Sequence, residues 1–273
     1  MISGMFQFTI LQSVYKNDKP EFLDQCFESI KNNSLQPVKI VLVKDGPISI
    51  DLDSIISKWL EKLPIQVVGY EQNQGLAYAL NYGLQFVETE LVARMDSDDI
   101  CYFDRFEKQI NYLMANPKIS LLSGYIDEFN FDFNIIASTR TVPLENTEIA
   151  NCLKKRNAFN HMAVMFKKSA IVESGGYQEV PYFEDYDLWV RIVQKGFLVA
   201  NIPEKLVKAR IGNDMIGRRH GFAYAKHEIF FLKRQLERGF VSKQEYCKLV
   251  LLRVPVRLLP KWGLKIVYKF LRG

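Results

Sequence analysis

The chain has 273 residues, 48% of them hydrophobic, so it can bury a sizeable core. It contains no apolar run long enough to span a bilayer and no N-terminal pattern of a secretory signal. The four cysteines lack both the spacing of a zinc site and the density of a disulfide scaffold. These features exclude an integral membrane protein and favour reduced thiols in a cytoplasm.

The net charge of +5 is unevenly distributed. Residues 205–273 carry 17 Lys and Arg against 4 acids, a balance of +13, which leaves −8 for residues 1–204. The chain therefore has an acidic body and a basic tail. We expect one compact domain over residues 1–215 and a helical, basic extension over residues 216–273.

Strands and helices alternate in the first part of the chain, judged from apolar runs and helical spacing. The predicted strands are 6–11, 38–43, 65–70 and 91–95. The predicted helices between them are 20–33, 52–63 and 76–87. This alternation predicts an α/β fold with a largely parallel sheet. In such sheets, ligands bind beyond the carboxyl ends of the strands, where the strand order reverses.

The second part of the chain is less regular. We expect helices at 104–116 and 168–174, two or three extended segments within 119–142, a strand at 162–166, and a helix from Glu184 through Val193. The prolines at 255 and 260 are expected to break the tail helix into shorter pieces.

Acidic side chains gather where the predicted strand 91–95 ends. Asp96, Asp98 and Asp99 place three carboxylates within four residues, and their mutual repulsion favours a hard divalent cation with oxygen ligands. A solvated acidic turn is the alternative for this motif in isolation. Asp45 follows another buried strand and is expected at the same edge of the sheet, although it can also cap a turn.

Two further segments carry chemistry. The helix at 76–87 opens at Gly75, just after Asn73, with small residues that let backbone amides approach an anion or let the helix pack tightly on the sheet. Glu184 and Asp185 open another helix among aromatic residues. Acids there favour the helix dipole, but partial desolvation also suits a general base.

Other candidates are weaker. His161 is a hydrogen-bonded structural residue or a substrate contact. Arg210, Arg218, Arg219 and His220 lie near two glycines, and we expect them in one loop, where cations can close over phosphates or stay solvated.

Six motifs in this order resemble the family-two glycosyltransferases of GT-A fold over about residues 7–220. They are the strand ending at Ser13 and Tyr15, the strand ending at Asp45, the segment Asn73 to Asn81, the run Ala93 to Asp99, Gly175 to Tyr177, and Glu184 to Trp189. Within that family the chain is most similar to bacterial enzymes of O-antigen, capsule and exopolysaccharide synthesis.

The resemblance implies a nucleotide-sugar donor, UDP being favoured, and inversion at the anomeric carbon. It implies that Asp45 contacts the nucleotide base, with Ser13 and Tyr15 in the same pocket. Asn73, Gly75 and Arg94 are assigned to the same donor site.

For the diphosphate, the resemblance implies that Asp98, with Asp96 near the ribose or sugar, binds Mg²⁺ or Mn²⁺. Asp99 supports the metal or touches the donor sugar. Asp185 is the implied general base, with Glu184 as its rival, and Trp189 is a platform for the acceptor sugar.

Cations recur every four residues in the tail at Arg253, Arg257, Lys261, Lys265 and Lys269, interleaved with apolar residues. Such a helix is expected either to lie on an anionic membrane surface or to pack on the acidic body. The resemblance implies an acceptor sugar linked to polyprenyl diphosphate, which favours a peripheral position on the cytoplasmic face of the inner membrane.

Two other classes of protein compete with this interpretation. A nucleic-acid-binding protein is disfavoured because the acidic crevice would repel phosphates, so we expect no nucleic-acid partner. A metal-dependent nucleotidyltransferase acting on sugar phosphates also uses paired acids. However, no Gly-rich loop with a basic residue follows the first strand here.

Overall fold

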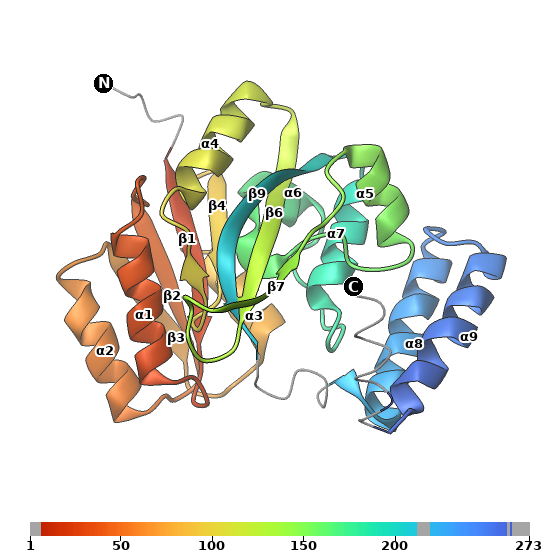
Figure 1. Cartoon of the computed structure of the whole chain (residues 1–273), viewed down its shortest axis with the longest axis horizontal. Helices are drawn as coiled ribbons and strands as arrows, with labels where there is room; N and C mark the ends of the chain where they lie inside the picture. Colours follow the sequence, from red (N-terminus) through yellow and green to blue (C-terminus); the bar gives the residue numbers. More distant parts are fainter. Residues whose placement is uncertain (1–6, 212–218, 261–262, 264–273) are drawn as a thin grey trace.

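The structure, a computed structural model, describes residues 7–211, 219–260 and 263. Its centre is a mixed sheet in the order β3-β2-β1-β4-β8-β6-β9-β5, with β7 paired to β6 (Figure 1). The strands are β1 Phe8–Val14, β2 Lys39–Asp45, β3 Ile65–Tyr70, β4 Leu91–Met95, β5 Ile100–Cys101, β6 Ile119–Phe129, β7 Ile136–Arg140, β8 Met165–Lys167 and β9 Leu198–Arg210.

Helices cover both faces of the sheet. They are α1 Pro20–Lys31, α2 Ile50–Leu60, α3 Leu76–Leu84, α4 Arg105–Ala115, α5 Asn146–Leu153, the 3₁₀ turn η2 His161–Ala163, α6 Lys168–Glu173, α7 Glu184–Gln194, α8 Phe222–Glu237 and α9 Lys243–Leu258. None of the helices in the described ranges is long and apolar enough to cross a bilayer.

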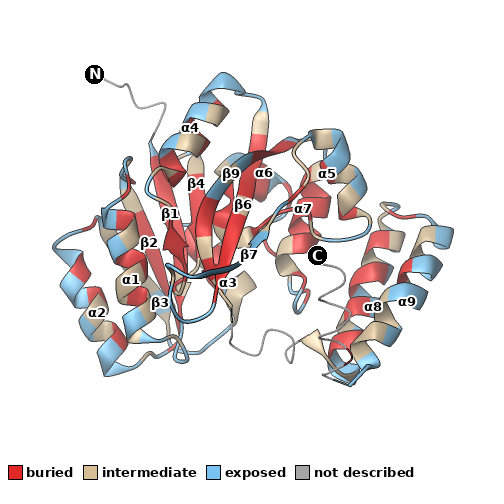
Figure 2. Ribbon diagram, viewed as in Figure 1, coloured by how far each residue is buried: buried red, intermediate tan, exposed pale blue. Residues whose placement is uncertain are grey.

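Alternation along the strands builds two cores, because successive side chains point to opposite faces. Ile10 and Leu42 pack with α1, α2 and α4 on one face. Leu11 and Val43 pack with α3, α5, α6 and α7 on the other. The buried residues run along the strands between the two helical layers (Figure 2).

The strand order positions the site. β1 pairs in parallel with β2 on one side and with β4 on the other, so the chain reverses its direction of winding at β1. Asp45 ends β2, and Asp96 directly follows β4. The prediction of a largely parallel α/β sheet with its acids at the strand-order switch is therefore confirmed.

Two local expectations were wrong. The predicted strand 162–166 begins instead as the turn η2, because buried Asn160 accepts a backbone hydrogen bond from Ala163 and donates its side chain to Gly124 O. The predicted break at Pro255 does not occur, and α9 runs through it to Leu258. Arg253 and Arg257 flank this proline and bind the same partner on α8, which holds the helix together there.

The helices α8 and α9 pack on the body. Phe231 of α8 stacks on Phe183, with ring centroids 4.8 Å apart, and packs on Tyr186 of α7 at 4.6 Å. Leu232 and Leu249 belong to the same apolar cluster as the α3 and α7 side of the sheet. The described part of the basic extension thus shares a core with the rest of the chain.

Candidate functional site

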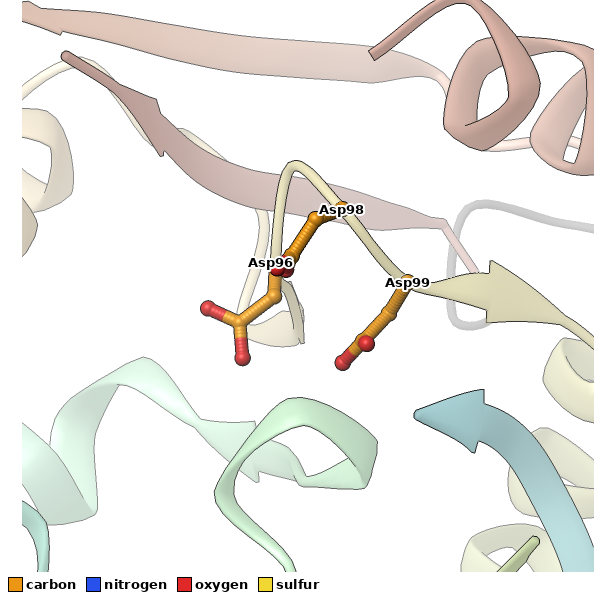
Figure 3. Close-up of side chains that lie close together, drawn as sticks. All are labelled: Asp96, Asp98 and Asp99. Atoms are coloured by element: carbon orange, nitrogen blue, oxygen red, sulfur yellow. The ribbon is translucent and has the colours of Figure 1, made fainter. Parts of the chain in front are cut away.

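The acidic run after β4 forms a tight group of carboxylates. Asp96, Asp98 and Asp99 each offer an oxygen, and these atoms lie within 4.8 Å of one another, as Figure 3 shows for the three side chains. Burial, and then repulsion by Asp96, raises the pKa of Asp98 to about 6. Burial and both neighbours also raise the pKa of Asp99. Each shift reports the cost of holding uncompensated negative charge at this point.

This group fits a divalent cation. Asp99 is almost fully buried, its Oδ1 accepts the backbone N–H of Arg210 at 2.8 Å, and its Oδ2 has no partner among the described residues. A hard cation would satisfy that oxygen and relieve the repulsion. Asp98 and Asp96 are the residues that would hold Mg²⁺ or Mn²⁺. Asp99, with its unpartnered Oδ2, would support the metal beside them.

Asp18, which the sequence analysis missed, is a fourth acid at this edge. It lies in the loop after β1, where it accepts hydrogen bonds from Ser97 Oγ at 2.9 Å and from the Tyr15 backbone at 3.1 Å. Burial raises its pKa to about 6, and Asp98 and Asp96 contribute. An acid shortly after the first strand was the available signal.

The predicted nucleotide pocket lies beside this group. Ser13 is half-buried near the end of β1 and Tyr15 is exposed just after it. Asp45 is buried, and its carboxylate accepts hydrogen bonds from Tyr70 Oη at 2.9 Å and Asn73 Nδ2 at 2.8 Å. It thereby ties β2 to the segment that leads into α3.

The backbone before α3 is bound to Asp45. The amides of Gln74 and Gly75 donate to the Asp45 carboxylate, at 2.7 Å and 3.1 Å, rather than facing an open anion site. Gly75 adopts φ +86°, a conformation that favours glycine, and a Cβ there would meet open space. The turn requires glycine at this position because of its positive φ. The anion that the Gly75 amide contacts is the Asp45 carboxylate of the protein itself.

The second acidic pair opens α7. Asp185 Oδ2 accepts a hydrogen bond from Asn157 Nδ2 at 2.7 Å, and Oδ1 accepts one from the Tyr186 backbone at 2.7 Å. Burial raises the pKa of Asp185, and burial together with Asp185 raises the pKa of Glu184 to about 7. The raised pKa makes each carboxylate a better proton acceptor than an ordinary exposed one. No sequence signal pointed to Asn157.

Arg94 links the two acidic groups. Its guanidinium is buried and paired with Asp96. It also acts electrostatically on Asp98 and Asp99 and on Glu184 and Asp185. One buried cation therefore acts on both acidic groups, one at the end of β4 and the other at the start of α7.

An aromatic group backs the crevice. His161 Nε2 lies 3.0 Å from Tyr177 Oη, and burial, with the charge of Arg94, lowers the pKa of His161 and keeps it neutral. Trp189 is fully buried, with its ring 5.8 Å from that of His161. It presents no exposed face on which a sugar could stack, so we place it behind the site as packing.

The basic loop expected near residues 210–220 is arranged differently. Arg210 is the last residue of β9, with its guanidinium 3.7 Å from the ring centroid of Phe22 and its Nη2 donating to Gln25 at 2.7 Å. Arg210 is therefore part of the strand, with its guanidinium packed against Phe22, and does not lie in a loop. His220 is half-buried just before α8, and Arg218 lies outside the described residues.

Asp187, the last acid of the Glu184 motif, is a structural hub. Fully buried, it pairs with Arg191 of its own helix at 2.8 Å and with Arg238 and Arg234 of α8 at 2.5 Å and 3.4 Å. Arg191 Nη2 in turn donates to Gly176 O at 2.7 Å. The helix that begins with the acidic pair is thereby fixed to the extension.

Known proteins match this chain over almost its whole length. It is 40% identical over 265 residues to the amylovoran biosynthesis glycosyltransferase AmsE of Erwinia amylovora, covering 96% of this chain and 98% of that protein. It is 35% identical over 263 residues to an Escherichia coli UDP-Gal:alpha-D-GlcNAc-diphosphoundecaprenol beta-1,3-galactosyltransferase, covering 96% and 95%.

Solved structures share the fold. A mannosyltransferase from Pyrobaculum calidifontis in complex with GDP-Man and Mn²⁺ has a TM-score of 0.65 at 16% identity, covering 98% of this chain and 76% of that one. S. aureus TarS in complex with UDP-GlcNAc also has a TM-score of 0.65, at 13% identity, covering 89% and 70%. These neighbours confirm the GT-A architecture. Residues 11–173 match the model of Glycosyl transferase family 2, and the chain belongs to that family.

Proposed function

We propose that this glycosyltransferase moves a hexose or N-acetylhexosamine from a UDP-sugar to a sugar carried on polyprenyl diphosphate, with inversion, in the synthesis of a surface polysaccharide. The observation that carries the proposal is the pair of acidic groups around Arg94, one suited to a cation and one to a proton. The name of the Escherichia coli relative supports the UDP-sugar donor and the lipid-linked acceptor, and the name of the Erwinia amylovora relative supports a role in polysaccharide synthesis.

The donor would bind at the strand-order switch. Asp45 orders the segment Asn73 to Gly75 beside the base pocket formed with Ser13 and Tyr15. Asp98 and Asp96 would hold Mg²⁺ or Mn²⁺, which stabilises charge growing on the departing diphosphate. Arg94 adds a fixed positive charge beside Asp96 in a water-poor setting.

The acceptor would lie against α7. Asp185, oriented by Asn157, takes the proton from the attacking hydroxyl, with Glu184 as the neighbouring candidate. The new glycosidic bond forms as the bond from the anomeric carbon to the diphosphate breaks, so the products are the extended acceptor, a nucleoside diphosphate and a proton. The hydroxyl oxygen attacks the anomeric carbon from the side opposite the departing diphosphate, which gives inversion, while the base takes up its proton.

A panel of nucleotide sugars tests the proposal, with synthetic lipid-diphosphate monosaccharides as acceptors and mass spectrometry as the readout. We expect one UDP-sugar to extend a lipid-linked acceptor by one sugar and release UDP. Release of pyrophosphate from a nucleoside triphosphate and a sugar phosphate would instead identify a nucleotidyltransferase. Transfer to free saccharides alone would overturn the lipid-linked acceptor.

A further inference from the structure

Two cations of α9 face the body of the protein and not a membrane surface. Arg257 Nε lies 2.7 Å from Glu228 Oε2 of α8, and Arg253 pairs with the same carboxylate. Glu228 is fully buried, so these two cations face the body of the protein. The remaining cations predicted for the tail, Lys261, Lys265 and Lys269, lie outside the described residues.

The opposite side of α9 is apolar and exposed. Leu251 is 74% exposed and Leu252 is 60% exposed, although both lie well inside a helix. Leu258 and Leu259 continue this surface toward the end of the helix, where Pro255 is also exposed. Helical spacing places Leu251, Pro255 and Leu258 on the side away from Leu249, which is buried, and Leu252 lies at the edge of that side. Contiguous exposed apolar surface of this kind marks an interaction site.

The surface extends to the beginning of α8. The backbone N–H of Gly221 donates to Arg257 O at 2.9 Å, so the start of α8, where Phe222 is 84% exposed, meets α9 at the residue before Leu258. We call this surface the apolar rim. It comprises Phe222, Leu251, Leu252, Leu258 and Leu259.

The segment that leads into the acidic pair of α7 contacts α8. Tyr182 precedes Glu184 by two residues, is 52% exposed, and adopts φ +70°, the one non-glycine residue in the left-handed region in the described part of the chain. Its ring packs on Tyr224 and His227 of α8, with centroids 5.0 Å and 5.6 Å away. Tyr224 follows Phe222 by two residues. The loop that carries the proposed base is therefore in contact with the helix that begins at the rim.

We propose that the apolar rim inserts into the interface of an anionic bilayer and holds the crevice over its lipid-linked acceptor. This rests on the proposed function, because only a lipid-linked acceptor requires the enzyme at the membrane. The positive charge of the residues near the rim favours an anionic bilayer over a protein as the partner. Lys248 is exposed on the same helix, and residues 261–273 follow the rim with four Lys and Arg and no acid. Apolar insertion beside cations is what an anionic lipid surface accepts.

The test compares a triple variant, Leu251→Ser with Leu252→Ser and Leu258→Ser, with a control, Ile50→Ser. Ile50 is 84% exposed on α2, which packs on the other face of the sheet. Binding is measured by flotation with phosphatidylcholine vesicles, with and without phosphatidylglycerol, at low and high salt. We expect wild type and control to float with the anionic vesicles and to stay partly bound at high salt. We expect the triple variant to lose about tenfold or more in partitioning.

Two outcomes would overturn the proposal. In one, the triple variant binds vesicles as wild type does. In the other, wild type self-associates in sedimentation experiments without binding vesicles, which would assign the rim to a second copy of the chain. Activity on a short-chain, water-soluble lipid-diphosphate acceptor separates this proposal from the proposed function. On this soluble acceptor the activity of the triple variant should match that of wild type, and its activity should be lower only on acceptor embedded in vesicles. If wild type transfers no sugar to the soluble acceptor, the proposed function itself is refuted.

Discussion

At the scale of single residues, the fold treats the two carboxyls of the proposed base site differently. Both oxygens of Asp185 accept hydrogen bonds, from Asn157 and from the Tyr186 backbone, so its orientation is fixed. Glu184 carries the pKa raised to about 7, caused first by burial and then by Asp185. Orientation favours Asp185 as the base, and Glu184 sets the local charge that the site must accommodate.

Asp185→Asn is expected to lower turnover by about 10³-fold or more, because the amide cannot accept the proton. Metal-dependent UDP binding, measured by calorimetry, should stay unchanged because the proposed nucleotide pocket lies at β1 and β2. Asp51→Asn, at an exposed acid of α2, is the matched control. Turnover close to that of wild type would remove Asp185 from the mechanism.

Glu184→Gln is expected to stabilise the protein in a pH-dependent way. A folded-state pKa of about 7 against an ordinary 4.5 means that the folded protein binds more protons within that window, so its stability falls as pH rises through it. We expect the variant to gain about 1–2 kcal/mol in free energy of unfolding at about pH 8, because partial exposure screens the full effect. No gain should remain at about pH 4. Urea unfolding at both pH values measures this, and equal gains would contradict it.

Removing the bound metal ion is expected to abolish sugar transfer. Thorough chelation should stop activity, and added Mn²⁺ or Mg²⁺ should restore it, because the carboxylates of Asp96, Asp98 and Asp99 converge within 4.8 Å. Asp98→Ala should weaken Mn²⁺ binding by about 10-fold or more, measured by calorimetry in the presence of UDP. Asp104→Ala, at an acid outside this group, provides the comparison. Full activity after chelation would refute the metal role.

Sequence reasoning identified these residues by type but could not give all their contacts. Asp98 and Asp185 stood out because acids followed a strand or opened a helix. Asn157 and Asp18 did not, since their importance arises from distant partners in the fold. The buried position of Trp189 also lay beyond the sequence, because an aromatic residue in an acidic motif can equally pack or bind.

At the scale of elements, Asp187 joins α7 to α8. Its carboxylate is fully buried among Arg191, Arg234 and Arg238, and this contact attaches the extension to the helix that begins with Glu184. Asp187 lies within the acidic motif Glu184 to Trp189, two residues after the proposed base. Its burial and three cationic partners show that it holds the fold together.

Asp187→Asn is expected to lower the free energy of unfolding by about 3–5 kcal/mol, because three guanidinium groups lose a buried counter-charge. Thermal and urea unfolding measure the loss. Asp24→Asn removes a partly exposed ion pair with Lys58 and should cost only about 1 kcal/mol or less. Similar losses in the two variants would show that the hub contributes little.

Regular elements were the most predictable part of the fold. The strands 65–70 and 91–95 begin and end where the apolar runs do. The turn at 161–163 and the unbroken α9 were not predicted, because each depends on partners far away in sequence. Asn160 binds β6, and the cations around Pro255 bind α8. Local propensity yields to tertiary contacts at both places.

At the scale of the whole molecule, the division at residue 215 marks a change in charge, while the apolar contacts run across it. Phe231 and Leu232 belong to the cluster that also contains Leu188 of α7 and Leu11 of β1. Composition alone predicts the change in charge. It does not predict the shared core, because that core joins residues far apart in the sequence.

A truncation that ends at residue 215 is expected to be insoluble or to unfold at least about 10 °C below wild type, because it exposes apolar α7 surface and removes two of the three cations paired with Asp187, Arg234 and Arg238. Expression yield, circular dichroism and thermal unfolding measure this. A truncation after residue 260 keeps α8 and α9 and is the control. A stable, monomeric protein ending at residue 215 would establish an independent domain instead.

The backbone at Tyr182 and its side chain favour different amino acids. A φ of +70° favours glycine, while the ring contacts with Tyr224 and His227 favour an aromatic residue. The chain carries tyrosine, so the ring contacts hold the segment before Glu184 in a backbone conformation that costs a residue with a side chain about 1–3 kcal/mol. Because Tyr182 lies two residues before Glu184, its ring is a natural place for a spectroscopic reporter of changes at the acidic pair.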